Sequence, residues 1–193
     1  MDDAKTYHHG NLKPALIAAG LEILEERGLD GLSLRACADR VGVSHTAPKN
    51  HFGNVTGLLT AIAAEGQKQL LIAMQTAPDA PKSDRRLAAA RGYVDFARAH
   101  PALFELMWSR RRVDFADPAL AAPMSACAAV LRDISTGMVW DKDGEPDADL
   151  RAQMMNWCLV HGFAQLSLQG VFDKDGMRHL GIDDILPDFP FRD

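Results

Sequence analysis

Apolar residues recur at a helical spacing along nearly the whole chain, and this pattern limits the fold more than any other feature. Leu34, Cys37, Ala38 and Val41 stand at positions i, i+3, i+4 and i+7, so they share one face of a helix. Alternating stretches of period two, bounded by turns, are missing, and residues that favour strands are sparse. The sequence therefore predicts an all-α protein.

Capping and turn residues divide this pattern into separate helices. Ser33, Ser44 and Asn54 are placed to cap helix starts, Gly42 to end a helix, and Asp117-Pro118 to open one. The last 25 residues are expected to hold a short helix or loop and an irregular tail. The predicted helices cover about residues 11–27, 34–41, 45–51, 55 onward, 84–100, 101–110, 118–138 and 147–168.

Two prolines within Ala77-Pro78-Asp79-Ala80-Pro81 mark a break between two parts of the chain. We expect residues 1–53 to form a three-helix DNA-binding head and residues 54–77 a connecting helix. Residues 78–193 are expected to form a helical domain for ligand binding and dimerisation.

Charge and cysteine usage narrow the class of protein. The net charge is -5, and residues 1–53 hold six Lys and Arg against seven Asp and Glu, so DNA binding would depend on a local face. Three widely separated cysteines indicate reduced thiols in the cytoplasm. Neither a signal peptide nor an apolar stretch of about 18 residues is found, so no membrane association is expected.

The segment from Ser33 to Phe52 reads as a short helix, a tight turn at Gly42 and a second short helix, which is the layout of a helix-turn-helix. Lys49 would neutralise a phosphate or reach a guanine, and Asn50 would read an adenine. A simple packed three-helix unit is the alternative interpretation. The residues predicted to contact DNA are Ser33, Arg35, Ser44, His45, Thr46, Lys49, Asn50 and His51. An N-terminal arm with Lys5 and His8-His9 would touch the flanking duplex.

Several runs of residues resemble the tetracycline-repressor (TetR) family. In the head they are Glu26-Arg27-Gly28, Ser33-Leu34-Arg35, Val41-Gly42-Val43-Ser44 and His51-Phe52. Tyr7-His8-His9-Gly10-Asn11-Leu12, Ala99–Met107 and Trp157–Gly162 resemble a subgroup with a Trp-His-Gly C-terminal domain. The resemblance implies a homodimer whose two recognition helices enter successive major grooves of an operator. It also implies a small-molecule effector that releases the repressor from DNA.

The sequence departs from the family pattern near the recognition helix. Lys49 stands where Tyr is usual, Asn50 where a basic residue is frequent, and Val55 near a usual Lys. Gly57 replaces a helix former, which predicts a helix weaker by about 1 kcal/mol than with Ala. These departures bear on the phosphate contacts more than on the fold.

The second part of the chain holds aromatic and flexible apolar residues of the kind that line small-molecule pockets. The candidates are Phe96, Phe104, Met107, Trp108, Met124, Cys127, Trp157, Cys158 and His161. The alternative for each is core or dimer interface. His161-Gly162 is either a close helix contact or a hydrogen bond to ligand. Helices near 118–138 and 147–168 are expected to pair in a four-helix dimer interface.

Two other classes of function were compared with a ligand-responsive DNA-binding repressor. One is a helical small-molecule-binding dimer whose head no longer grips DNA, which the near-neutral head and the missing Tyr and Lys favour. The other is an enzyme, but no nucleophile elbow, phosphate loop or metal-ligand spacing is found. We expect a regulator without catalytic residues, cofactor or metal.

Overall fold

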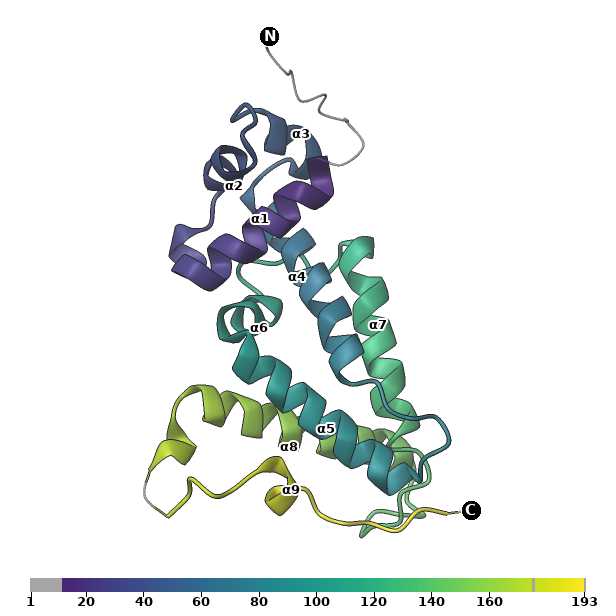
Figure 1. Ribbon diagram of the computed structural model, residues 1–193. Coiled ribbons are helices and arrows are strands. Elements are labelled where there is room, and N and C mark those ends of the chain that lie inside the picture. Colours follow the sequence, from purple (N-terminus) through teal and green to yellow (C-terminus); the bar gives the residue numbers. More distant parts are fainter. Residues whose placement is uncertain (1–11, 175, 193) are drawn as a thin grey trace.

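The computed structural model describes residues 12–174 and 176–192, and within these ranges the chain is helical and forms no strand. Figure 1 shows α1 to α3 at one end of the molecule and α8 and α9 at the other. In chain order the elements are α1 (Leu12–Arg27), η2 (Leu29–Gly31), α2 (Leu34–Val41), α3 (Ala47–Phe52), α4 (Val55–Ala73), α5 (Lys82–Ala99), α6 (Pro101–Met107), α7 (Pro118–Asp133), α8 (Ala148–Leu168), η3 (Val171–Asp173) and α9 (Ile182–Ile185).

The head is a small bundle in which α1 packs against α2, and α2 packs against α3. Leu16 and Leu24 of α1, like Cys37 and Ala38 of α2, are fully buried, so water is excluded between the two helices. Leu34 lies partly buried against the same core, as the helical spacing predicts. The predicted arm with Lys5, His8 and His9 lies outside the described residues.

Three predicted helix starts are confirmed by their caps. The Ser33 hydroxyl accepts a hydrogen bond from the backbone N–H of Ala36 at 3.1 Å, and the Asn54 side chain accepts one from Gly57 at 3.0 Å. Asp117 caps α7 ahead of Pro118. These contacts satisfy N–H groups that the first helical turn leaves without partners.

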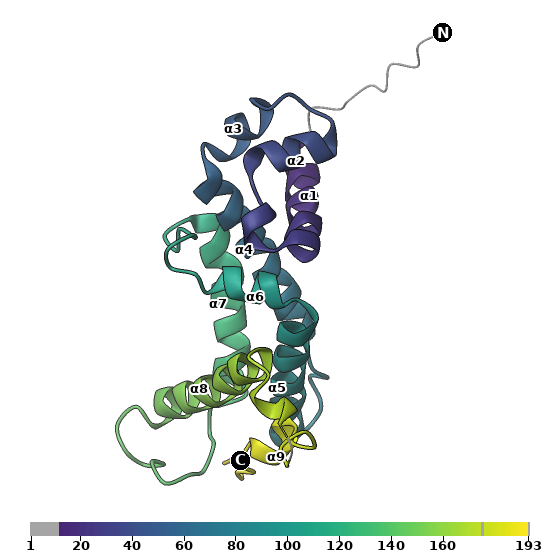
Figure 2. The same cartoon turned by 90° about the vertical axis from the view of Figure 1, so that its left-hand side faces the viewer.

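Helix α4 connects the head with the rest of the molecule. It packs against α1 and α3 near its start and against α5, α6 and α7 farther along. Figure 2 shows α7 and α8 toward one side of the molecule and α1 and α5 toward the other. Phe104, Leu106 and Met107 of α6 are fully buried in the core between α4 and α5. Helix α4 thus contacts both the head and the helices farther from it.

Three predicted helix boundaries are wrong. Helix α3 begins at Ala47, and its cap position is Thr46, whose side chain makes no capping bond, so Ser44 is not the cap. Helix α6 ends at Met107 rather than near residue 110. Helix α7 ends at Asp133 rather than Met138.

The early end of α7 has a tertiary cause. The backbone of Gly137 turns with φ 79° and accepts a hydrogen bond from Arg192 at 2.7 Å, while Val139 donates to Pro190 at 2.8 Å. The C-terminal tail therefore pairs with the segment that the sequence predicts as the last turn of α7. This pairing joins segments far apart in the sequence, which helical spacing does not reveal.

Candidate nucleic-acid interface and ligand cavity

The outer surface of α2 and α3 carries every side chain predicted to contact DNA. All eight are exposed: Ser33, Arg35, Ser44, His45, Thr46, Lys49, Asn50 and His51. Pro48, at the start of α3, is buried and holds the helix on the head, since proline is accommodated in the first helical turn. These eight exposed residues are called the polar ridge of the head below.

Asp39 adds a negative charge to this ridge. Its carboxylate lies 2.6 Å from His45 Nε2 and 3.9 Å from Arg35 Nε. The Ser44 and Thr46 hydroxyls are 3.2 Å apart and bond to each other. These contacts order the turn before α3, and they also offset part of the positive field that phosphates would meet.

Arg40 lies partly exposed at the contact between α2 and α1 and pairs with acidic residues of α1. Its guanidinium donates to Glu26 at 2.5 and 2.7 Å and to Glu22 at 3.2 Å, which links α2 to α1. The hydrogen bond from Arg40 lowers the pKa of Glu26 and raises that of Arg40 itself. Two of the head's acidic groups are therefore neutralised within the head, away from the predicted DNA face.

The junction between α3 and α4 is tightly packed. A Cβ placed on Gly57 would lie 2.0 Å from the carbonyl oxygen of Phe52, the last residue of α3. Lys13 of α1 lies over the Phe52 ring, 5.9 Å from its centroid. Gly57 therefore permits a close approach of α4 to α3. This packing role adds to the lower helix propensity that the sequence predicts for Gly57.

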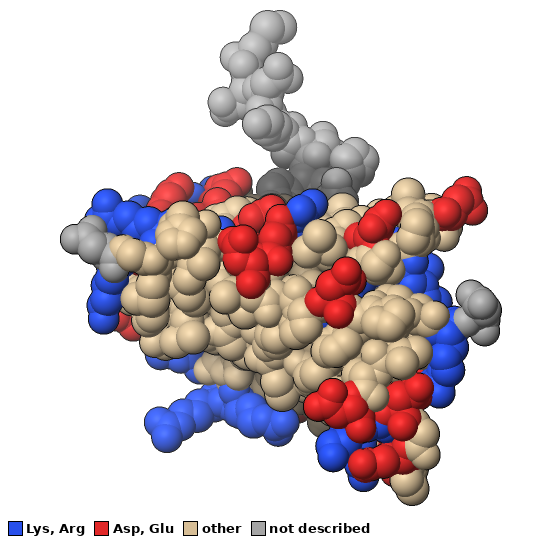
Figure 3. Space-filling view, turned by 90° about the horizontal axis from the view of Figure 1, so that it is seen from below, with Lys and Arg blue, Asp and Glu red and all other residues tan. Residues whose placement is uncertain are grey.

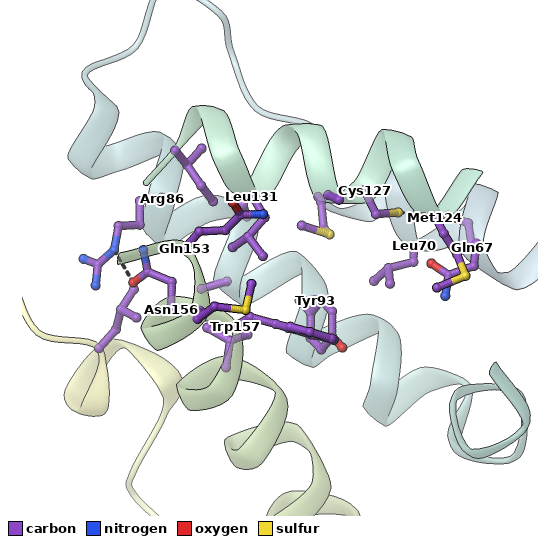
Figure 4. A pocket seen from close by; sticks show the side chains of 18 of the residues that line it. Gln67, Leu70, Arg86, Tyr93, Met124, Cys127, Leu131, Gln153, Asn156 and Trp157 are labelled. Atoms are coloured by element: carbon purple, nitrogen blue, oxygen red, sulfur yellow. Dashed lines mark hydrogen bonds between the residues drawn. The ribbon is translucent and has the colours of Figure 1, made fainter. Parts of the chain in front are cut away.

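A cavity of about 170 Å³ lies between α4, α5, α7 and α8. Figure 4 shows Gln67 near Met124 at one end and Arg86 near Asn156 at the other, with Tyr93 and Trp157 along one side. Most of the lining is apolar. Its residues are Gln67, Leu70, Met74, Arg86, Ala89, Ala90, Tyr93, Trp108, Met124, Cys127, Ala128, Leu131, Ile134, Gln153, Met154, Asn156, Trp157, Val160 and Leu186.

The structure brings four of the predicted ligand-binding residues to this cavity: Trp108, Met124, Cys127 and Trp157. The others do not line it: Phe96, Phe104 and Met107 are buried in the core, Cys158 is exposed, and His161 lies behind Tyr93. A Cβ on Gly162 would meet nothing within 4 Å in the chain, so Gly162 makes no close helix contact within the protomer.

His161 has a structural partner beside the cavity. Its Nδ1 lies 2.8 Å from the Tyr93 hydroxyl, and its ring packs edge-on against Trp108 at 5.1 Å between centroids. Burial lowers the pKa of His161 and raises that of Tyr93. Both groups are therefore neutral near pH 7. His161 packs behind Tyr93 and Trp108, two aromatic residues that line the cavity.

Sequence reasoning missed the polar lining residues Gln67, Arg86, Gln153 and Asn156. A polar residue at an otherwise apolar helical position was the available signal for Gln67, which follows the buried Ala63 and Ala64. The Cys127 thiol donates to the Gln67 backbone oxygen at 3.4 Å, and burial raises its pKa to about 11. The thiol is thus a packing and hydrogen-bonding group.

Comparison with known proteins assigns the chain. The family described as "Tetracyclin repressor-like, C-terminal domain" matches residues 87–185, just over half of the 193 residues. The chain belongs to the tetracycline-repressor family. A structure of a protein with unknown function from Rhodococcus sp. RHA1 is 32% identical, with 94% of this chain and 92% of that chain covered and a TM-score of 0.73.

Two further relatives of this TetR protein carry functional names. The uncharacterized HTH-type transcriptional regulator YobS of Bacillus subtilis (strain 168) is 24% identical over 86% of this chain and 84% of its own length. BioQ, in a structure with its natural double-stranded DNA operator, is 21% identical, covers 82% of this chain and 87% of its own, and has a TM-score of 0.55. Mycobacterium smegmatis BioQ matches at 23% identity, 86% and 89% coverage and the same TM-score. At such identities, the BioQ structures show the fold alone.

The end of the molecule remote from the head carries charges of both signs. Figure 3 looks onto this end: uncharged surface fills its middle, Asp and Glu form separate clusters, and Lys and Arg lie toward its margins. Among the described helices, none has the length and apolarity needed to cross a bilayer. In the same ranges no group of three or more His, Cys, Asp or Glu is arranged to hold a metal ion.

Proposed function

We propose that this TetR-family protein is a sequence-specific DNA-binding transcriptional regulator, acting as a repressor that a small molecule releases from its operator. The exposure of the whole polar face of α2 and α3 carries the proposal. A short helix held by a buried Pro48 and bearing polar side chains outward is suited to lie in the major groove.

The individual contacts follow from position and chemistry. Ser33 places a hydroxyl and the N-terminus of α2 toward a phosphate, and Arg35, two residues later, pairs with the DNA backbone. Lys49 and Asn50 are the third and fourth residues of α3, and both are exposed, so they reach a base edge or a phosphate. His51 and the Ser44–Thr46 turn contact the flanking backbone.

Helix α4 supplies a physical connection between the cavity and the head. Gly57 packs against the end of α3, and Gln67 lines the cavity ten residues later, about 15 Å along the helix at 1.5 Å per residue. His100, at the start of α6, contacts Glu25 of α1 at 3.0 Å and offers a second link. A ligand that shifts α4 or α6 would thus change how the head is presented.

The protein is proposed to act as a cytoplasmic homodimer through α7 and α8. Leu150, Met154 and Trp157 stand at i, i+4 and i+7 on α8, and each is exposed, as is Leu166. A second copy would cover this stripe, and two helices from each copy would form a four-helix bundle. The proposed division is a head of residues 1–53, a connecting helix of residues 54–77, and a ligand and dimer domain of residues 78–193.

Selection of bound sequences from random duplex DNA tests the proposal, followed by affinity measurements on the enriched site. Lys49→Ala should weaken binding and reduce the slope of log affinity against log salt by about 1 for each of the two half-sites that the dimer contacts. Lys68→Ala is the matched control, because Lys68 is an exposed lysine on α4 paired with Glu65. Equal salt slopes for the parent and Lys49→Ala would show that α3 does not face DNA as proposed.

A second candidate function is a helical small-molecule-binding dimer whose head no longer grips DNA. Asp39 on the ridge, together with Lys49 in place of the family's usual Tyr, favours it. Folded, dimeric protein that enriches no sequence in the selection would support this candidate and reject the regulator.

A further inference from the structure

Unpaired N–H donors gather around the cavity. In the part of the chain that the structure describes, four buried side-chain polar atoms have no hydrogen-bond partner: Gln67 Nε2, Arg86 Nη2, Trp108 Nε1 and Trp140 Nε1. The first three belong to residues that line the cavity. All are donors, and an unpaired buried donor is destabilising, so the free protein is short of acceptors at this place.

Gln67 is the most deeply buried of the three cavity-lining residues that carry an unpaired donor. Gln67 is 1% exposed, and its Nε2 donates no hydrogen bond to another described side chain or backbone group. Figure 4 shows this amide at the end of the cavity near Met124. A terminal amide turns easily about its last torsion, so its N–H can face a bound molecule without moving α4.

Arg86 is placed differently. Its Nε donates to Asn156 at 2.9 Å, its Nη1 donates to the Pro187 carbonyl at 2.7 Å, and its guanidinium lies over the Phe189 ring. Figure 4 shows the guanidinium at the far end of the cavity from Gln67 and turned outward past Asn156. Its charge therefore serves the packing of the C-terminal segment, and it also disfavours a cationic ligand.

The size and walls of the cavity restrict the ligand's body. A volume of about 170 Å³ is close to that of the roughly 150 Å³ apolar cavity that holds one benzene. Tyr93, Trp108 and Trp157 supply aromatic walls. Met154 and Trp157 line the cavity and are also 37% exposed in the single protomer, so they form its outer wall, which the proposed dimer would cover.

We propose that the effector is an uncharged compound built on one substituted ring, whose hydrogen-bond acceptor, a carbonyl or ether oxygen, receives the Gln67 N–H. The class of ligand is inferred from the cavity, and only the statement that this ligand is an effector rests on the proposed function. Gln67 is then the residue that selects among ring compounds of equal size, because an analogue without the acceptor leaves the buried donor unpaired.

Calorimetric titration of the full chain, without DNA, with acetophenone and α-methylstyrene tests the proposal. The two probes have the same shape and differ in a carbonyl against a methylene. Acetophenone should bind about threefold to tenfold more tightly. Gln67→Leu should remove the difference, while Gln75→Leu, the same change at an exposed position two residues beyond the end of α4, should keep it.

Equal affinities of the parent protein for the two probes would overturn the proposal, and this comparison needs no variant. So would a preference that persists in Gln67→Leu, or benzoate binding more tightly than acetophenone, which would indicate a charged ligand. Because the titration contains no DNA, the proposed ligand class and the proposed DNA-binding function can be rejected independently of each other. A preference for acetophenone together with no operator in the selection would retain the ligand class and reject the regulator.

Discussion

Replacing Gly57 with Ala tests whether this glycine is required by its close contact with Phe52 or merely lowers the propensity of α4 to form a helix. By helix propensity alone, Gly→Ala inside α4 should stabilise the protein by about 1 kcal/mol. In the structure the added Cβ would lie 2.0 Å from the Phe52 carbonyl oxygen, whereas ordinary contacts begin at 3.4 Å. The end of α3 and the start of α4 must therefore separate by about 1.4 Å.

The free-energy cost of that separation decides whether Gly57→Ala stabilises or destabilises the protein. Overpacking costs typically about 1–3 kcal/mol, and a clash with backbone belongs at the upper end because a carbonyl cannot change rotamer. With the propensity gain of about 1 kcal/mol subtracted, the net loss is about 2 kcal/mol. For a chain of this length that lowers Tm by about 4–8 °C. The same displacement tilts α3, so operator affinity should fall too.

Gly162→Ala is the matched control. Gly162 lies inside α8 at an ordinary φ, and a Cβ there would meet nothing within 4 Å. This variant should gain about 1 kcal/mol and raise Tm by about 2–4 °C. Thermal and urea unfolding would be compared at one protomer concentration, since dimerisation contributes to stability. If Gly57→Ala is as stable as the parent, the close approach of α4 to Phe52 is not a constraint.

Two further predictions concern the body. Burial lowers the pKa of His161 below its ordinary 6.5, so the unfolded chain takes up the proton first on acidification. The neutral His161 therefore contributes its full stability above about pH 6.5, and this contribution is lost as the pH falls. The urea midpoints measured at about pH 7.5 and about pH 5.5 should therefore differ less in His161→Gln than in the parent protein. Phe104→Ala, at a fully buried site, should cost about 3–5 kcal/mol in urea unfolding, whereas Ile72→Ala, at 65% exposure, should stay within about 0.5 kcal/mol. Similar losses in both variants would contradict the core assignment.

Features governed by neighbours within one helical turn were predictable from the sequence. The caps at Ser33, Asn54 and Asp117 depend on side chains and N–H groups two or three residues apart, and all three are confirmed. Gly42 takes the left-handed conformation at the end of α2 for the same local reason. The outward face of α3 follows from helical spacing, which also places Pro48 toward the core.

The cavity was only partly predictable, because its walls come from helices that meet only in the folded chain. Aromatic and sulfur side chains pointed to Trp108, Met124, Cys127 and Trp157, but the same residue types at Phe104 and Met107 are core. Composition does not distinguish the two roles. Whether an apolar side chain faces a void or a neighbour depends on how α4, α5, α7 and α8 cross.

The all-helical class, the order of the helices and the polar ridge of the head were determined by the sequence itself, since periodicity and caps act over a few residues. The end of α7, the role of Gly57 and the unpaired donor at Gln67 were decided by the tertiary structure alone. Each depends on a backbone or side-chain group brought close by packing, or left without a partner by it. Such proximity is a property of the assembled helices, and no single stretch of residues contains it.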